Sequence, residues 1–519
     1  MSHSIIDKKQ AAEYLTGFSD LFVRIQNPST VYPSHEICPI ALPLTAFSEL
    51  PVAALMDMDG TTTTTETLCL HSLEFAVRAA MGAAGADWKG LDPDTDYPNV
   101  IGNSTTRHVE YLVDAYGQYF DADALGNAFL KAAKWTLRYG RDKQRRQQVE
   151  INLRLAGVHP SVLESDHCGS EYGSKTTTGT GSGTGSETSS GDGTGTGSET
   201  GSKASEGHPD ADPTGRNQEQ SGPEAGKTAL RIGHPDLITA ACIDIYYQRY
   251  HEILAAIERG DRAFLQQIPG LDSRQSFIEP MPAVALTLAL LKGDLGSEAE
   301  LIPLPERTHP GNPLNESGLP DSSQPDSPRP GNSLNEGGLP DSPLPDSPHP
   351  DTKTVLRKLG LFFQDHPQKL ALVTSSIRYE ADIVMQEVFR SIREETASWP
   401  VSAAVKTKLE ERFRHPQNCY DSIVTADDSS EMRLKPHRDL YSIALQQLGI
   451  PPDQFDRVIG FEDSDSGTVA IRTAGIGRCI ALPFHETIGH AFNAASVIAR
   501  GGLPEVLARH RFFLDTLLP

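Results

Sequence analysis

The sequence feature that most constrains the fold is a short apolar run, residues 52–56, followed directly by Asp57, Asp59 and Gly60. The run is too short for a typical helix, and Gly60 ends it, so the pattern predicts a buried β-strand. Such a strand carries two carboxylates, two residues apart, to its carboxyl end, where open parallel sheets bind ligands. At that edge one carboxylate can attack an electrophile while the other handles a proton.

The Asp-x-Asp-Gly pattern alone leaves two other interpretations. Calcium-binding loops share it, but they continue with further oxygen ligands and a late glutamate. Here five threonines, residues 61–65, and then Glu66 follow, and a buried strand before the motif is untypical of a calcium loop. A strand and turn without any chemistry is the second alternative.

A second apolar run, residues 369–373, ends in the hydroxyl side chains of Thr374 and Ser375. Helical periodicity over residues 377–392 predicts that a helix starts just after them. Hydroxyl and amide groups at a helix start can hold a phosphoryl oxygen. The alternative is that these side chains only cap the helix and bind no ligand.

Two further segments carry charge at positions that suit the same site. Lys435 precedes a proline that can open a helix, and there it offers a compact positive charge to a phosphate or a carboxylate. The apolar stretch 458–461 predicts a strand that ends in Glu462 and Asp463. Carboxylates of this kind suit Mg²⁺, which also keeps waters and substrate phosphate as ligands. The alternatives are a solvated surface lysine and an acidic surface turn.

The order of these segments resembles the motifs of the haloacid dehalogenase superfamily of phosphohydrolases. Within it the chain is most similar to the branch with a helical cap after the first motif, which includes phosphoglycolate phosphatase-like and beta-phosphoglucomutase-like enzymes. Asp57, Asp59, Gly60 and Thr61 match the first motif, Thr374 the second, Lys435 the third, and Glu462 with Asp463 the fourth. The chain departs from the branch in its threonine run and in Ala283, which stands where the branch usually has glycine.

The resemblance implies an α/β fold: a Rossmann-like parallel sheet as the core, with a mainly α-helical cap. It also implies roles for the matched residues. Asp57 would be the nucleophile that forms an aspartyl-phosphate, and Asp59 the general acid and base. Mg²⁺ would be held by Asp57, by the backbone carbonyl of Asp59, and by Asp463 with Glu462. The phosphoryl group would be bound by Gly60, Thr61, Thr374, Ser375 and Lys435, with Thr374 and Lys435 also counted as catalytic.

We therefore expect a Mg²⁺-dependent phosphatase that hydrolyses a small phosphorylated metabolite. A sugar phosphomutase of the beta-phosphoglucomutase type is the alternative enzyme, since the two differ only in whether water or a second hydroxyl takes the phosphoryl group. A catalytically inactive binding or scaffold protein is the non-enzymatic alternative. The sequence does not identify the substrate, because specificity in this branch comes from the cap.

Composition shifts along the chain of 519 residues predict its domains. We expect an N-terminal helical segment (1–50), a catalytic core (51–66 and 279–519) and a helical cap (67–278). A Gly/Ser/Thr-rich stretch (165–229) predicts a flexible coil within the cap. A Pro-rich stretch with a repeat of about twenty residues (293–352) predicts a disordered insert in the core, because it lacks the apolar positions that stacked repeats need.

The charge and the cysteine content limit the kinds of partner and the cellular location that we expect. A net charge of −23 argues against nucleic acid or an anionic membrane as the general partner. The six cysteines are scattered and form no Cys-x-x-Cys pair, which favours reduced thiols, a cytoplasmic location and no zinc site. Residues 1–9 lack the apolar stretch of a signal peptide. No run of eighteen apolar residues suggests a membrane span.

Overall fold

The computed structural model describes residues 5–27, 32–93, 95–101, 105–160, 230, 232–268, 278–305, 351–429, 433–484, 487 and 489–518. The predicted Gly/Ser/Thr-rich coil and most of the predicted Pro-rich insert lie outside these residues.

A six-stranded parallel sheet forms the centre of the fold, in the order β5-β4-β3-β6-β7-β8. Its strands are β3 (Ala53–Asp57), β4 (Lys369–Val373), β5 (Ser422–Val424), β6 (Val458–Glu462), β7 (Arg478–Ala481) and β8 (Val497–Ile498). All five residues of β3 are buried, and β3 pairs in parallel with β4 on one side and β6 on the other. The carboxyl ends of the three motif-bearing strands therefore meet at one edge of the sheet. The predicted α/β fold with a parallel sheet is confirmed.

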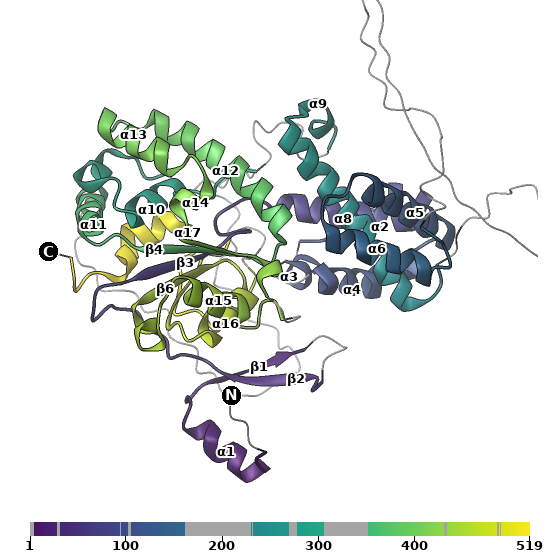
Figure 1. Cartoon of the computed structure of the whole chain (residues 1–519), viewed down its shortest axis with the longest axis horizontal. Coiled ribbons are helices and arrows are strands. Elements are labelled where there is room, and N and C mark those ends of the chain that lie inside the picture. Colours follow the sequence, from purple (N-terminus) through teal and green to yellow (C-terminus); the bar gives the residue numbers. More distant parts are fainter. Residues whose placement is uncertain are drawn as a thin grey trace, which may run out of the picture. The chain divides into compact units, whose positions relative to one another are not determined.

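Helices cover both faces of this sheet (Figure 1). On one side lie α10 (Val284–Leu291), α11 (Thr352–Asp365), α12 (Arg378–Ser398), α13 (Ala403–Arg412), α14 (Pro416–Cys419) and α17 (Gly502–Glu505). On the other lie α15 (Asp439–Gln447) and α16 (Asp465–Thr473). Short helical turns are η3 (Gly296–Leu301), η4 (Ala426–Asp428), η5 (Pro452–Arg457), η6 (Val506–His510) and η7 (Arg511–Phe513). All eight residues of α10 are buried, as expected for a helix that is apolar on every face.

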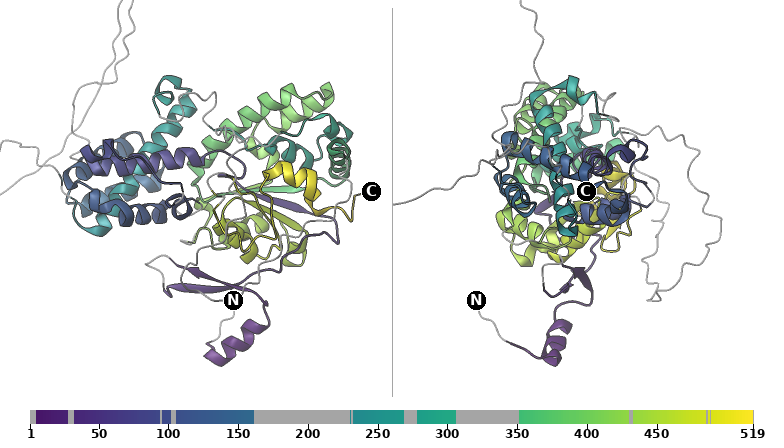
Figure 2. Two further views of the ribbon diagram at one scale, coloured as in Figure 1. Left: turned by 180° about the vertical axis from the view of Figure 1, so that it is seen from behind. Right: turned by 90° about the vertical axis from the view of Figure 1, so that its right-hand side faces the viewer.

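A group of helices stands between β3 and α10 in the chain, and we call it the helical insertion. It comprises α2 (Glu66–Met81), η1 (Gly82–Ala86), α3 (Tyr97–Val100), α4 (Thr105–Tyr116), η2 (Gly117–Tyr119), α5 (Ala122–Tyr139), α6 (Lys143–Leu155), α8 (Pro235–Arg259) and α9 (Arg262–Leu265). The long helix α8 packs against α2, α4, α5 and α6, and these helices gather in one bundle in both views (Figure 2). No strand occurs among the described residues of this insertion.

The N-terminal segment differs from the prediction of helices alone. Only α1 (Lys8–Thr16) is helical there, and β1 (Phe22–Gln26) and β2 (His35–Pro39) pair as a small antiparallel sheet. Their side chains are mostly exposed or half-buried, so the strands lack the continuous apolar signal that marked the central ones. The following chain then docks on the core, where Leu44 N donates to Gly477 O at 3.0 Å.

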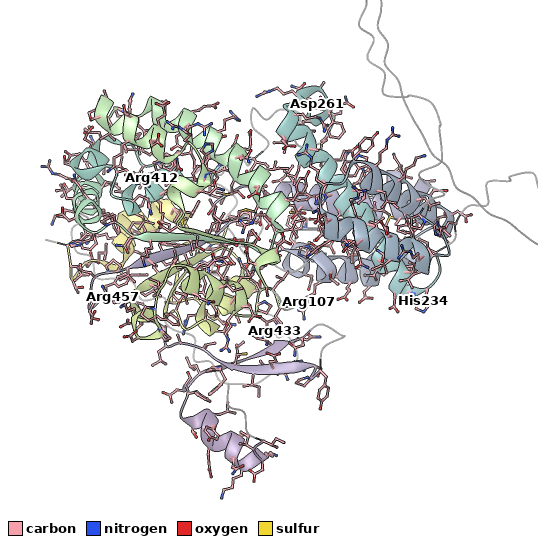
Figure 3. The ribbon with its side chains drawn as sticks, in the orientation of Figure 1. Arg107, His234, Asp261, Arg412, Arg433 and Arg457 are labelled. Carbon is pink, nitrogen blue, oxygen red and sulfur yellow. The ribbon has the colours of Figure 1, made fainter. Side chains whose placement is uncertain are left out.

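The structure also orders the beginning of the predicted Pro-rich insert. Residues 293–305 are described, and η3 packs against α11. Asp294 is buried and accepts hydrogen bonds from Arg412 of α13, with Nε to Oδ2 at 2.8 Å. Figure 3 labels Arg412 among the helices that cover this face of the sheet. A buried carboxylate that keeps such a partner fixes the chain locally. Among the described helices, none is long and apolar enough to cross a membrane.

Candidate active site

The first motif forms a tight turn directly after β3. Asp57 is the last residue of that strand and is only 4% exposed. Gly60 adopts a positive φ of 79°, which a residue with a side chain rarely adopts. A Cβ atom at this position would also lie 2.5 Å from Asp463 Oδ2. Glycine is thus required by both the backbone and the close approach of the fourth-motif acid.

Lys435 joins the first and fourth motifs. Its Nζ donates to Asp57 Oδ1 and, at 2.5 Å, to Glu462 Oε1. Burial alone would lower the pKa of this lysine, but the two carboxylates outweigh burial and raise it. The ammonium therefore stays charged. The surface-lysine alternative is wrong, because the side chain is 7% exposed. Pro436 opens no helix, since α15 begins only at Asp439.

Glu462 is fully buried, and its two oxygens are saturated with hydrogen bonds. Besides Lys435, Oε1 accepts from the Tyr441 hydroxyl at 3.0 Å. Oε2 accepts from the Ser464 hydroxyl at 3.0 Å and from the amides of Asp463 and Ser464 at 3.2 Å. A buried carboxylate with this many donors is held in one orientation. The acidic-surface-turn alternative is wrong for this segment.

Asp57, Glu462 and Asp463 bring carboxylate oxygens within 4.8 Å of one another. Burial, with the neighbouring charge of Glu462, raises the pKa of Asp57 and that of Asp463 well above their ordinary values. The cause is that three buried carboxylates face a single ammonium. Thr61 contributes by donating to Asp463 Oδ1 at 3.2 Å. A divalent cation is the ligand that such a cluster of hard oxygen donors fits.

Asp59 lies on the other side of the turn and is oriented by hydroxyl groups. Thr374 and Ser376 each donate to its Oδ2 at 3.0 Å, and Thr65 donates to its Oδ1. The N-cap of α12 is Ile377, with no side-chain cap bond. The helix-cap alternative for Thr374 and Ser375 is therefore wrong. The hydroxyl of Thr374 instead donates its hydrogen bond to Asp59.

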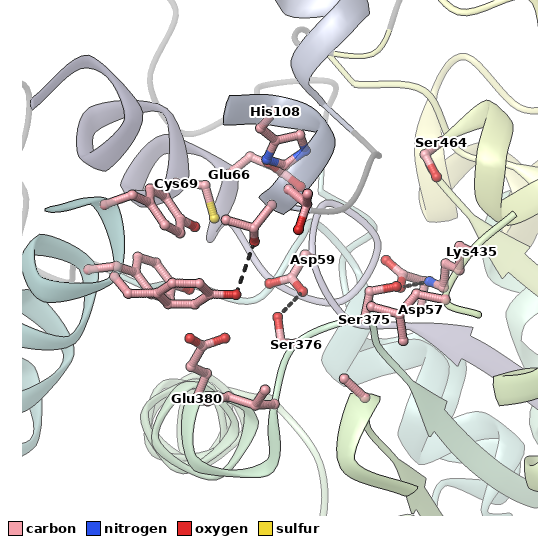
Figure 4. Close-up of a pocket in the computed structure, with 18 of the residues that line it drawn as sticks. Asp57, Asp59, Glu66, Cys69, His108, Ser375, Ser376, Glu380, Lys435 and Ser464 are labelled. Carbon is pink, nitrogen blue, oxygen red and sulfur yellow. Dashed lines mark hydrogen bonds and ion pairs between the residues drawn. The ribbon is translucent and has the colours of Figure 1, made fainter. Parts of the chain in front are cut away.

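These side chains border a cavity of about 200 Å³, drawn in Figure 4. Five of the residues proposed from the sequence line it: Asp57, Asp59, Ser375, Lys435 and Asp463. The other four, Gly60, Thr61, Thr374 and Glu462, do not line it and instead position those that do. The helical insertion supplies the opposite wall, which includes Tyr246 and Tyr250 of α8. The cavity is thus built by the sheet edge and the helical insertion together.

Several contacting residues had not been singled out from the sequence. Ser376 and Thr65 each stand close to a matched motif, and a search for hydroxyls near Asp59 would have included them. Tyr441, which donates to Glu462, lies inside α15 and carries no distinguishing local pattern. Tyr246 and Tyr250 lie inside the long helix α8, whose local pattern does not mark them as cavity residues.

Sequence comparison finds relatives that match part of this chain. The chain is 32% identical over 116 residues to protein CbbY of Cereibacter sphaeroides, covering 22% of this chain and 48% of that protein. It is 29% identical over 133 residues to protein CbbY of Rhodobacter capsulatus, covering 24% of this chain and 56% of that protein. The chain that gives these matches also brings its four motifs together at one edge of the sheet. These matches support the resemblance to the haloacid dehalogenase superfamily over 22–24% of the chain. The chain spans about half the length of the curated relatives it matches, and no family model matches it.

Solved structures also match, at low identity. CbbY from Rhodobacter sphaeroides in complex with phosphate is 12% identical, with a TM-score of 0.36, covering 88% of this chain and 96% of that one. A putative beta-phosphoglucomutase from Thermotoga maritima is 13% identical, with a TM-score of 0.32, covering 90% and 100%. A putative phosphoglycolate phosphatase from Lactobacillus delbrueckii subsp. bulgaricus is 13% identical, with a TM-score of 0.33, covering 89% and 100%.

Proposed function

We propose that this protein is a Mg²⁺-dependent phosphatase that hydrolyses a small phosphorylated metabolite through an aspartyl-phosphate on Asp57. The observation that carries the proposal is the pair of carboxylates at the end of β3, which have opposite surroundings. Asp57 faces the Lys435 ammonium and two further acids. The Asp59 carboxylate accepts hydrogen bonds from the hydroxyl groups of Thr65, Thr374 and Ser376. Two carboxylates in different surroundings suit different roles in one reaction.

The residues present fit a Mg²⁺ ion. Asp57 and Asp463 line the cavity and offer the carboxylate oxygens that this ion prefers. Glu462 already accepts five hydrogen bonds, so in our proposal it positions Lys435 and Asp463 rather than binding the ion directly. When bound, the ion would supply positive charge that favours ionised carboxylates and draws the phosphoryl group towards Asp57.

In the first step an Asp57 carboxylate oxygen attacks phosphorus, and the bond between phosphorus and the leaving alcohol oxygen breaks. Asp59 donates a proton to that oxygen. In the second step Asp59 takes a proton from water, the water oxygen attacks phosphorus, and the bond to Asp57 breaks to release phosphate. Thr65, Thr374 and Ser376 hold the Asp59 carboxylate in place for both transfers. Lys435 stabilises negative charge beside Asp57 throughout.

The helical insertion has the position of a cap in this proposal, since it forms the cavity wall opposite the sheet edge. The leaving alcohol would lie against Tyr246, Tyr250 and Glu66, which line that wall. Closing such a wall over the site excludes water and orients the substrate.

A phosphate-release assay tests the proposal. Wild type and Asp57→Asn would be mixed with a panel of phosphorylated metabolites, with and without Mg²⁺. We expect release that requires Mg²⁺ and falls by at least about a thousandfold in the variant. Asp453→Asn serves as the matched control, since Asp453 is an exposed acid outside the cavity lining. Release that is equal with and without Mg²⁺, or no release from any compound, would contradict the proposal.

A further inference from the structure

The cavity has a strong excess of acidic side chains over basic ones. Among its described lining residues are five carboxylates: Asp57, Asp59, Glu66, Glu380 and Asp463. Lys435 is the one lysine or arginine among them, and its ammonium is already bound to Asp57 and Glu462. A second phosphoryl group on a substrate needs arginine, lysine or a free helix N-terminus for its recognition. The described lining offers no such arginine or further lysine.

The N-terminus of α12, one of several helices that begin beside the cavity, does not supply this charge. Helix α12 begins just after Ser375, Ser376 and Ile377, which line the cavity. The amide of Arg378 in its first turn already donates to Asp427 Oδ2 at 2.7 Å. Glu380 also stands in this first turn, and a carboxylate there complements the helix dipole that an anionic ligand would otherwise use.

Glu380 is held in place against the cavity wall. It is 5% exposed, and its Oε1 lies 2.8 Å from Nε2 of His251, a residue of α8. Glu380 and three tyrosines of α8 line the same cavity, and Figure 4 labels Glu380 at its wall. Burial raises the pKa of Tyr246, and the negative charge of Glu380 raises it further. The field of Glu380 therefore reaches the part of the cavity that would hold the leaving alcohol.

The same wall offers neutral groups. Burial raises the pKa of Tyr247 to about 12, and Glu380 adds to that rise. Burial likewise raises the pKa of Tyr250. These phenols stay protonated at neutral pH, so they present ring faces and hydroxyl donors without charge. They suit an uncharged alcohol.

We infer that the substrate carries a single phosphoryl group, and that Glu380 is a specificity-determining residue that rejects leaving alcohols bearing further negative charge. The inference rests on the proposed phosphatase function and names the substrate class of that site. Rejection by a fixed like charge is a recognised way to separate otherwise similar substrates. Because Glu66 and Glu380 line the part of the cavity that would hold the leaving alcohol, the penalty acts on the charge of the alcohol.

Matched substrate pairs test the inference. Glycerol 3-phosphate and 3-phosphoglycerate differ mainly in the charge of the alcohol, as do glucose 1-phosphate and glucose 1,6-bisphosphate. Wild type should show a kcat/KM at least about tenfold higher for the uncharged alcohol of a pair. Glu380→Gln keeps the size of the side chain and a hydrogen bond to His251. It should reduce this ratio at least about threefold, chiefly by improving kcat/KM for the charged member.

Glu258→Gln is the matched control. Glu258 belongs to α8 of the helical insertion, pairs with Arg141 on the exposed surface, and should leave the ratio unchanged when replaced. A wild type that hydrolyses the charged member equally well or better would overturn the inference while leaving the phosphatase intact. A ratio that Glu380→Gln does not change would overturn the role of Glu380. No release from either member of both pairs would contradict the phosphatase proposal itself, and the inference with it.

Discussion

The ammonium of Lys435 lies 2.5 Å from the carboxylate of Glu462, although 27 residues separate them in the chain. The pair links the segment before α15 to the end of β6, and Lys435 also reaches Asp57 at the end of β3. Glu462 is fully buried and Lys435 nearly so. A buried ion pair fixes its two side chains relative to each other. Removing one partner leaves the other charge buried and unpaired, which destabilises the fold.

Removal of the lysine should therefore destabilise the fold as well as abolish turnover. Lys435→Met leaves buried carboxylates without their cation, which costs about 3–5 kcal/mol. The free energy of unfolding, measured with urea, should fall by that order. Adding Glu462→Gln to Lys435→Met should recover part of the loss, because one buried charge is removed. A double variant less stable than Lys435→Met would contradict the pairing.

Gly467 should tolerate no side chain. A Cβ atom there would lie 1.9 Å from Glu462 Oε1, so Gly467→Ala must displace the carboxylate that holds Lys435. We expect a loss of about 1–3 kcal/mol in stability, together with reduced phosphate release. Gly233→Ala is the matched control, because a Cβ atom at that position meets nothing within 4 Å. Equal stability of the two variants would show that the approach of Gly467 to Glu462 is not tight.

Asp463 should govern metal affinity. Asp463→Asn removes a charged oxygen ligand from the proposed Mg²⁺ site while keeping the size of the side chain. The Mg²⁺ concentration for half-maximal activity should rise at least about tenfold, and direct calorimetric titration should show the same shift. Asp465→Asn, two residues further on, is the control and should bind the ion as wild type does. An unchanged titration for Asp463→Asn would place the ligand elsewhere.

Lowering the pH should decrease the free energy of unfolding because of His71, a residue of the helical insertion. Burial, together with the nearby Arg249 and Arg78, lowers the pKa of His71 from 6.5 to about 4. Above pH 6.5 the side chain is neutral in both states, and its effect on stability is absent. As the pH falls from 6.5 towards 4 the unfolded chain takes up a proton that the folded chain does not, so stability decreases.

His71→Gln tests this pH dependence. Allowing for partial exposure of the ring, the loss attributable to His71 should amount to about 1–2 kcal/mol between pH 7 and pH 4. Urea denaturation across this range should therefore show a shallower decline for His71→Gln than for wild type. His234→Gln, at an exposed site, should follow wild type. Parallel curves for wild type and His71→Gln would contradict the assignment.

The sheet edge could be predicted from sequence because each motif directly follows a strand. Three apolar runs end in Asp57, Thr374 and Glu462, and parallel strands must bring these ends together. The outer part of the fold could not be predicted this way. Strands β1 and β2 are short and largely exposed, so their sequences carry little hydrophobic periodicity.

The cavity wall opposite the sheet edge also could not be predicted from the sequence. Tyr246 and Glu380 are separated by more than a hundred residues, and they line one cavity only because α8 packs against α12. Nothing in the local pattern of α8 distinguishes a tyrosine that faces a cavity from one that packs in a core. The hydroxyl of Tyr441 is another case, because its partner Glu462 lies on β6.

The most direct test of the account is to trap the covalent intermediate on Asp57. Protein mixed with radiolabelled substrate in Mg²⁺ would be quenched in acid within the first turnover, digested, and the labelled peptide identified. We predict transient label on the peptide containing Asp57, released by hydroxylamine and absent from Asp57→Asn. Rapid phosphate release with no label at any time, or label on a different residue, would contradict the proposal that Asp57 is the nucleophile.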